Sequence, residues 1–80
     1  FNPTTEIDYG IPEESMVDIT IYDIMGRSVS RLVQSHMNAG YHSIIWNATN
    51  SLGDPVSAGM YFYTIQAGEY RVTKKMLLLK

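Results

Sequence analysis

Apolar side chains recur at every second position through most of this chain. The pattern is clearest in two early runs, Ile7–Ile11 and Val17–Ile21, where apolar residues alternate with polar ones or glycine. A period of two places alternate side chains on opposite faces of an extended strand. The six tyrosines add to this tendency, because aromatic residues favour strands. The sequence therefore predicts an all-β fold, although a short helix over residues 27–34 stays open.

Turn signals divide the chain at intervals of about ten residues. Pro12 ends the first strand, and Gly26 marks a tight turn over 23–27 after a second strand that runs to about Asp23. Further strands are expected over 28–33, 41–46, 61–65 and 70–80, with loops over 34–40 and 47–55. This spacing predicts one domain over residues 1–80, an antiparallel, immunoglobulin-like β-sandwich of six to seven short strands.

Charge is segregated along the sequence. Residues 1–23 contain acidic but no basic residues, whereas residues 71–80 contain basic but no acidic ones. Opposite charges on neighbouring strands attract weakly. We therefore expect the last strand to lie beside an early one, with a basic docking patch as the alternative.

The sequence shows no motif for catalysis or for binding a cofactor or metal. It has no cysteine, so it lacks a disulfide framework, a thiolate metal site and a cysteine nucleophile. His36, expected in a polar loop, and His42, expected on a strand, have no ligand-spaced partners. Residues 50–54 are only faintly similar to a calcium loop, so a plain turn is expected there. We expect a domain that is not an enzyme and, because its net charge is −2, does not bind nucleic acid.

The aromatic residues allow two interpretations. Tyr61 and Tyr63 are expected to share one face of their strand, with Phe62 on the other face. His42 and Trp46 are likewise expected to share one face of their own strand. Packing in the core explains them most simply. Stacking of a sugar on Tyr61, Tyr63 or Trp46 is the alternative.

Four segments, in this order, carry a resemblance to a known family: Phe1–Thr5 with Ile7, Tyr9 and Ile11–Pro12; Val17–Val29; Gly40, His42, Trp46–Asn47, Gly53 and Val56–Tyr63; and Lys74–Lys80. Together they resemble the C-terminal sorting domains of type IX secretion cargo in Bacteroidetes-like bacteria (Por secretion system type A). The third segment is also similar to the immunoglobulin-like domain of flagellar hook-capping proteins. The resemblance covers essentially the whole chain.

The resemblance implies a C-terminal domain of a larger secreted protein, with the cargo upstream in the same chain. It implies export through the periplasm and across the outer membrane, to the cell surface or the medium. The implied partners are the outer-membrane type IX translocon and a sortase-like peptidase that usually removes the domain. The alternative is a non-catalytic immunoglobulin-like module, structural or carbohydrate-binding, of a cell-surface protein.

The closing strand is apolar on both faces, with Leu77 and Leu79 on one and Met76 and Leu78 on the other. One face is expected to enter the core. The other needs a neighbouring strand, a second copy in a weak homodimer through an edge strand, or a receptor. The residues that we expect the translocon to recognise are Gly59, Tyr61, Lys74, Lys75, Met76, Leu77, Leu78, Leu79 and Lys80.

Overall fold

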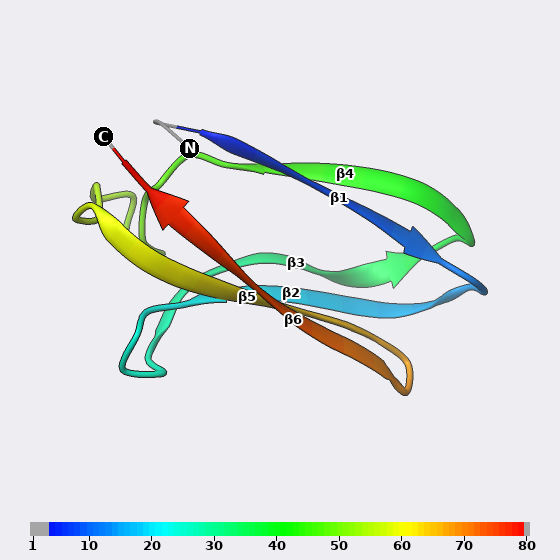
Figure 1. Ribbon diagram of the computed structural model, residues 1–80. Coiled ribbons are helices and arrows are strands. Elements are labelled where there is room, and N and C mark those ends of the chain that lie inside the picture. Colours follow the sequence, from blue (N-terminus) through cyan, green and yellow to red (C-terminus); the bar gives the residue numbers. More distant parts are fainter. Residues whose placement is uncertain (1–3, 80) are drawn as a thin grey trace.

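The computed structural model describes residues 4–79, which form two antiparallel β-sheets (Figure 1). One sheet has four strands, in the order β3 (Ser28–Met37), β2 (Ser15–Tyr22), β5 (Gly59–Ala67) and β6 (Tyr70–Leu78), and the other pairs β1 (Thr5–Ile11) with β4 (Gly40–Trp46). Phe1, Asn2, Pro3 and Lys80, which belong to the predicted motifs, lie outside the described residues. The all-β sandwich predicted from the alternation is confirmed.

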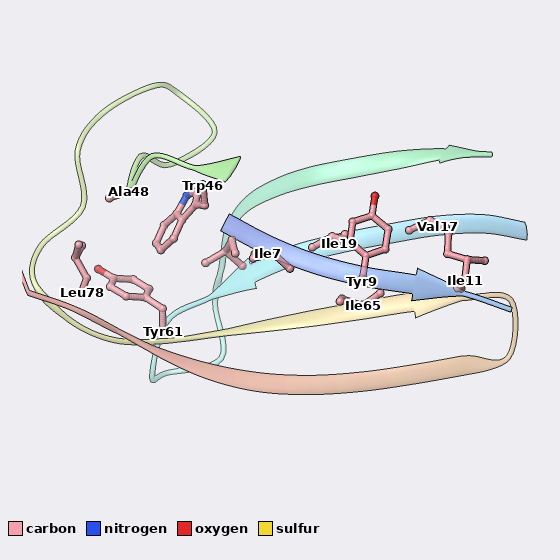
Figure 2. Packing of buried hydrophobic residues seen from close by; sticks show 12 residues of the cluster. Ile7, Tyr9, Ile11, Val17, Ile19, Trp46, Ala48, Tyr61, Ile65 and Leu78 are labelled. Atoms are coloured by element: carbon pink, nitrogen blue, oxygen red, sulfur yellow. The ribbon is translucent and has the colours of Figure 1, made fainter. Parts of the chain in front are cut away.

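The core lies between the two sheets. The alternating side chains of β1 and β2 point into it, and Val17, Ile19 and Ile21 are fully buried. Figure 2 shows Ile7, Tyr9 and Ile11 of β1 facing the buried side chains of β2 and β5. The Tyr9 hydroxyl donates a hydrogen bond to Met37 Sδ at 3.2 Å, which links β1 to the far end of β3.

The turn between β2 and β3 is held by the Asp23 carboxylate. Its Oδ1 accepts hydrogen bonds from the amides of Met25, at 2.9 Å, and Arg27, at 3.0 Å. The Arg27 guanidinium contacts Oδ2 at 2.9 Å. Gly26 has φ +81°, a conformation that glycine adopts without steric cost, so the turn predicted at this glycine is confirmed.

The third strand is longer than predicted, and the loop expected over residues 34–40 was wrong for most of its length. β3 continues to Met37, which pairs with Ser15 at the start of β2. The backbone ladder does not depend on side-chain polarity, and β3 lies at the edge of its sheet, where polar side chains remain in solvent. Residues 28–34 belong to this strand, so they do not form the helix that was left open over residues 27–34.

The neighbour expected for the last strand was also wrong. Among the described residues β6 pairs with β5, and the early strand β2 lies between β5 and β3. Two early acidic residues lie beside residues of β3 instead: Arg31 Nε is 3.2 Å from Asp18 Oδ2, and the His36 ring atom Nδ1 is 3.2 Å from Glu14 Oε2. The short turn between β5 and β6 fixes their pairing, which a few surface charges do not override.

Within residues 4–79, the protein contains no helix with the length and apolar character needed to span a membrane.

Candidate functional site

The two faces of β6 follow from its register with β5. Tyr61 pairs with Met76 and Ile65 with Val72, which places Val72, Met76 and Leu78 on the core face. The intervening positions, including Thr73, Lys75 and Leu77, face outward, and Thr73 Oγ1 lies 3.1 Å from Thr64 Oγ1 on β5.

Leu78 closes one end of the core. It is 1% exposed, and Figure 2 shows it at the same end as Trp46, Ala48 and Tyr61. The rings of Trp46 and Tyr61 meet edge to face with centroids 5.3 Å apart. The Tyr61 hydroxyl donates to the Ser57 carbonyl at 2.6 Å, and Trp46 Nε1 donates to the Thr49 carbonyl at 2.9 Å. The end of β6 is therefore a structural part of the domain and not a loose tail.

The candidate recognition residues divide by burial. Tyr61 and Leu78 lie in the core and Met76 is half-buried, whereas Lys74, Lys75, Leu77 and Leu79 are exposed. Gly59 begins β5 with φ +143°, and Lys80 lies outside the described residues. The part of this set that a partner can reach at the surface is thus Lys74, Lys75, Leu77 and Leu79, with Gly59 beside them through its pairing with Leu78.

An apolar surface that the sequence did not single out lies next to this set. Ile24 and Met25 in the β2–β3 turn and Met60 on β5 are exposed, and Met60 pairs with Leu77. These three residues line a shallow hollow of about 300 Å³ together with Asp23, Arg27, residues 57–59 and Tyr61. The sequence did contain a signal for this surface, because Ile24 and Met25 are adjacent apolar residues in a predicted tight turn. Side chains in such a turn are seldom buried in the core.

Asp23 and Arg27 are the charged residues that line the hollow. The hydrogen bond from the Arg27 amide is the largest influence, and the Met25 amide and the Arg27 guanidinium add to it, so the pKa of the Asp23 carboxyl lies below its ordinary value. The Asp23 carboxylate accepts hydrogen bonds from groups of the turn itself, so its role is to stabilise the turn.

The remaining polar clusters are also structural. Asn50 Oδ1 accepts hydrogen bonds from the amides of Leu52, at 2.9 Å, and Asp54, at 3.0 Å, so residues 50–54 form the plain turn that was expected. His36 lies on β3, not in a loop. His42 stacks on Tyr9 with ring centroids 5.6 Å apart, and its Nε2 lies 2.8 Å from the Asn38 carbonyl. Among residues 4–79 there is no group of three or more potential metal ligands.

The aromatic rings considered for sugar stacking are packed inside the domain. Trp46 and Tyr61 are buried, and Tyr63 is partly buried, with burial and then the Asp8 carboxylate raising the pKa of its phenol. The core interpretation of these rings is confirmed. Among residues 4–79, the most exposed ring is that of Tyr41, which lies against Gly10 on the outer face of the two-stranded sheet.

These features define a small immunoglobulin-like β-sandwich. Its edge strand β6 exposes both basic and apolar side chains. The chain belongs to the FlgD Ig-like domain family, whose sequence model matches residues 4–72. The match ends before Lys74, so the closing segment lies beyond it. No curated protein matches this chain.

Solved structures support the same fold. FlgD from P. aeruginosa is 25% identical to this chain, with a TM-score of 0.73. The match covers 92% of this chain and 57% of the FlgD chain. FlgD from Xanthomonas campestris, described in connection with hook capping in flagellar assembly, is 22% identical with a TM-score of 0.72, and covers 94% of this chain and 55% of its own. The present chain thus spans little more than half the length of these proteins.

Proposed function

We propose that this chain is a non-catalytic sorting domain of type IX secretion, which directs an upstream cargo in the same polypeptide across the outer membrane. The receptor is the outer-membrane translocon, and a sortase-like peptidase removes the domain on export to the cell surface or the medium. The observation that best supports the proposal is that β6 has both buried side chains and exposed basic and apolar side chains. Leu78 and Met76 complete the sandwich core, while the side chains of Lys74, Lys75 and Leu77 are exposed on the same sheet-edge strand.

Two further observations support this function. The resemblance to sorting domains extends through Lys74–Lys80, whereas the match to the FlgD Ig-like family ends at residue 72. The sequence model of the FlgD Ig-like family therefore does not include the basic and leucine-rich closing segment, although β6 belongs to the sandwich. A receptor that reads this segment would meet it on a folded domain, because Leu78 is buried among core residues.

The experiment is a fusion of the 80 residues behind a reporter with an export signal, expressed in a bacterium that uses this secretion route. Removing residues 74–80 is unsuitable as the main variant, because it removes Leu78 from the core. The informative variant combines Lys74→Ala, Lys75→Ala and Leu77→Ala, which changes exposed side chains. We expect the reporter to accumulate in the periplasm while the thermal stability of the purified domain stays near that of the parent.

The control is Arg31→Ala, which removes an exposed cation from β3, the opposite edge strand of the four-stranded sheet. This control should still be delivered to the surface. Delivery of the triple variant at the parental level would refute the proposed function.

A retained structural module is the competing function, and membership of the FlgD Ig-like family favours it. The two functions differ in the fate of the domain. Mass spectrometry of the mature surface protein distinguishes them, because a sorting domain is removed during export and a structural module remains at the end of the chain.

A further inference from the structure

The outer side of β6 is a regular strand edge. Its register with β5 runs without interruption from the Gly59–Leu78 pair to the Ala67–Tyr70 pair, and no strand within residues 4–79 pairs with its other side between Arg71 and Met76. The opposite edge of the same sheet differs, because the β2–β3 register shifts between Ile19 and Thr20 and again between Ile21 and Tyr22. Such irregularities twist an edge and disfavour strand addition. Of the two edges, β6 is the better template for an added strand.

The charge of β6 selects the kind of strand that can be added. Arg71, Lys74 and Lys75 are exposed, and β6 contains no acidic residue. The strands of the smaller sheet, β1 and β4, contain no lysine or arginine. A second copy paired antiparallel through β6 would bring cations close to cations, which is unfavourable, whereas an acidic strand would be attracted.

The core face of β6 adds an apolar requirement. Val72 and Met76 are packed against the core but only partly buried, and they flank Lys74 on the same face. A strand added beside them would cover their exposed surface if it carried apolar residues opposite each and an acidic residue between. The outward face would match Arg71 and Lys75 with two further acidic residues.

We propose that the outer side of β6, from Arg71 to Met76, binds an extended acidic segment of the export receptor as an added antiparallel strand. Only the naming of the partner as the export receptor rests on the proposed function. The geometry of pairing concerns this chain alone and is tested without a secretion system.

The probe is a blocked peptide, Val-Glu-Glu-Thr-Val-Glu, which places valine opposite Met76 and Val72 and glutamate opposite Lys75, Lys74 and Arg71. It is titrated into the ¹⁵N-labelled 80-residue chain at low salt. We expect the largest shifts of amide resonances in β6, and slower hydrogen exchange for those β6 amides that point away from β5. A peptide with lysine in place of each glutamate should bind roughly tenfold more weakly or worse.

Backbone methylation separates strand pairing from simple attraction between charges. Alternate amides of an added strand point toward β6 and away from it. Two peptides, methylated at one or the other alternate set of amide nitrogens, should therefore differ sharply, with one binding and the other not. Equal binding of the two methylated peptides would overturn the proposal, as would shifts centred on β3.

Charge variants of the protein complete the test. Lys74→Glu with Lys75→Glu should weaken binding of the glutamate peptide roughly tenfold or more, since both attractions become repulsions. The control, Arg31→Glu, reverses a charge on β3 at the opposite edge of the sheet and should bind as the parent does. Similar weakening in both variants would overturn the proposal. Peptide binding at β6 combined with normal export of the exposed-residue variant would refute the sorting function while leaving the strand-addition site intact.

Discussion

Two adjacent leucines in β6 provide a direct test of how this strand is built. Leu78 is 1% exposed and lies in the core cluster, whereas Leu77 is 51% exposed on the outer face. The substitutions Leu77→Ala and Leu78→Ala remove the same atoms from neighbouring positions of one strand. Any difference between their effects on stability therefore reports the burial of the two side chains.

The expected difference follows from what each side chain loses. Leucine to alanine removes three carbon atoms, each worth about 0.8 kcal/mol when buried. The cavity left behind adds to this loss, so Leu78→Ala should lower the free energy of unfolding by about 3 kcal/mol. Leu77→Ala should cost less than about 1 kcal/mol, since much of its side chain is already in water. A chain of this size has a total stability of roughly 4–12 kcal/mol, so the first loss is a large share.

The assay is urea unfolding followed by the fluorescence of Trp46, the only tryptophan of the chain, which is itself 1% exposed. Thermal unfolding gives a second measure, because about 3 kcal/mol corresponds to a midpoint lower by roughly 12–24 °C in a domain of this length. Equal losses for the two variants, or a loss below about 1 kcal/mol for Leu78→Ala, would refute the assignment of the faces.

Three further predictions concern single residues. Gly26→Ala should cost about 1 kcal/mol in urea unfolding, because φ +81° suits glycine, and Gly26→Asn should cost less; equal costs would contradict this. Ser15→Ala should leave the free energy of unfolding unchanged or raise it, because within the described residues the buried Ser15 hydroxyl has no hydrogen-bond partner; a clear loss of stability would contradict it. The lowered pKa of Asp23 means that its ionised form stabilises the fold above the ordinary value of 3.8, and that this contribution is lost as pH falls through the lower folded value. An NMR titration should place the Asp23 midpoint below 3.8, and Asp23→Asn should remove its part of the acid destabilisation; an unshifted midpoint would argue against the turn geometry.

The strands with one apolar face were predictable from the sequence because burial on one side leaves a clear period of two. Ile7, Tyr9 and Ile11 show this in β1, and their alternation is the same in the structure. The second half of β3 was not predictable in this way. Gln34, Ser35 and His36 lie on an exposed edge, where the backbone ladder with β2 holds the strand and the side chains carry no periodic signal.

Strand neighbours were harder to predict than strands. The segregated charges suggested a partner for the last strand, but surface ion pairs contribute too little to choose one. The alternation of a strand places Leu77 and Leu78 on opposite faces. The register that pairs Gly59 with Leu78 was needed to identify which of these faces is the core face. The exposed edge of β6 depends on the order of all four strands, which no local pattern in residues 70–80 encodes.

The strand order also has a consequence for how fast the domain can assemble. β2 with β3, and β5 with β6, are hairpins that close locally, and such units form in about 1–10 μs. Joining them requires β2 to meet β5, with Tyr22 opposite Phe62, and the smaller sheet requires Thr5 to meet Trp46. These pairings between distant parts of the sequence must overcome the entropy of loop closure before they are rewarded by burial, which places folding in the slow range of milliseconds to seconds. We therefore expect the two hairpins to form first, and the four-stranded sheet to be complete only when β2 pairs with β5.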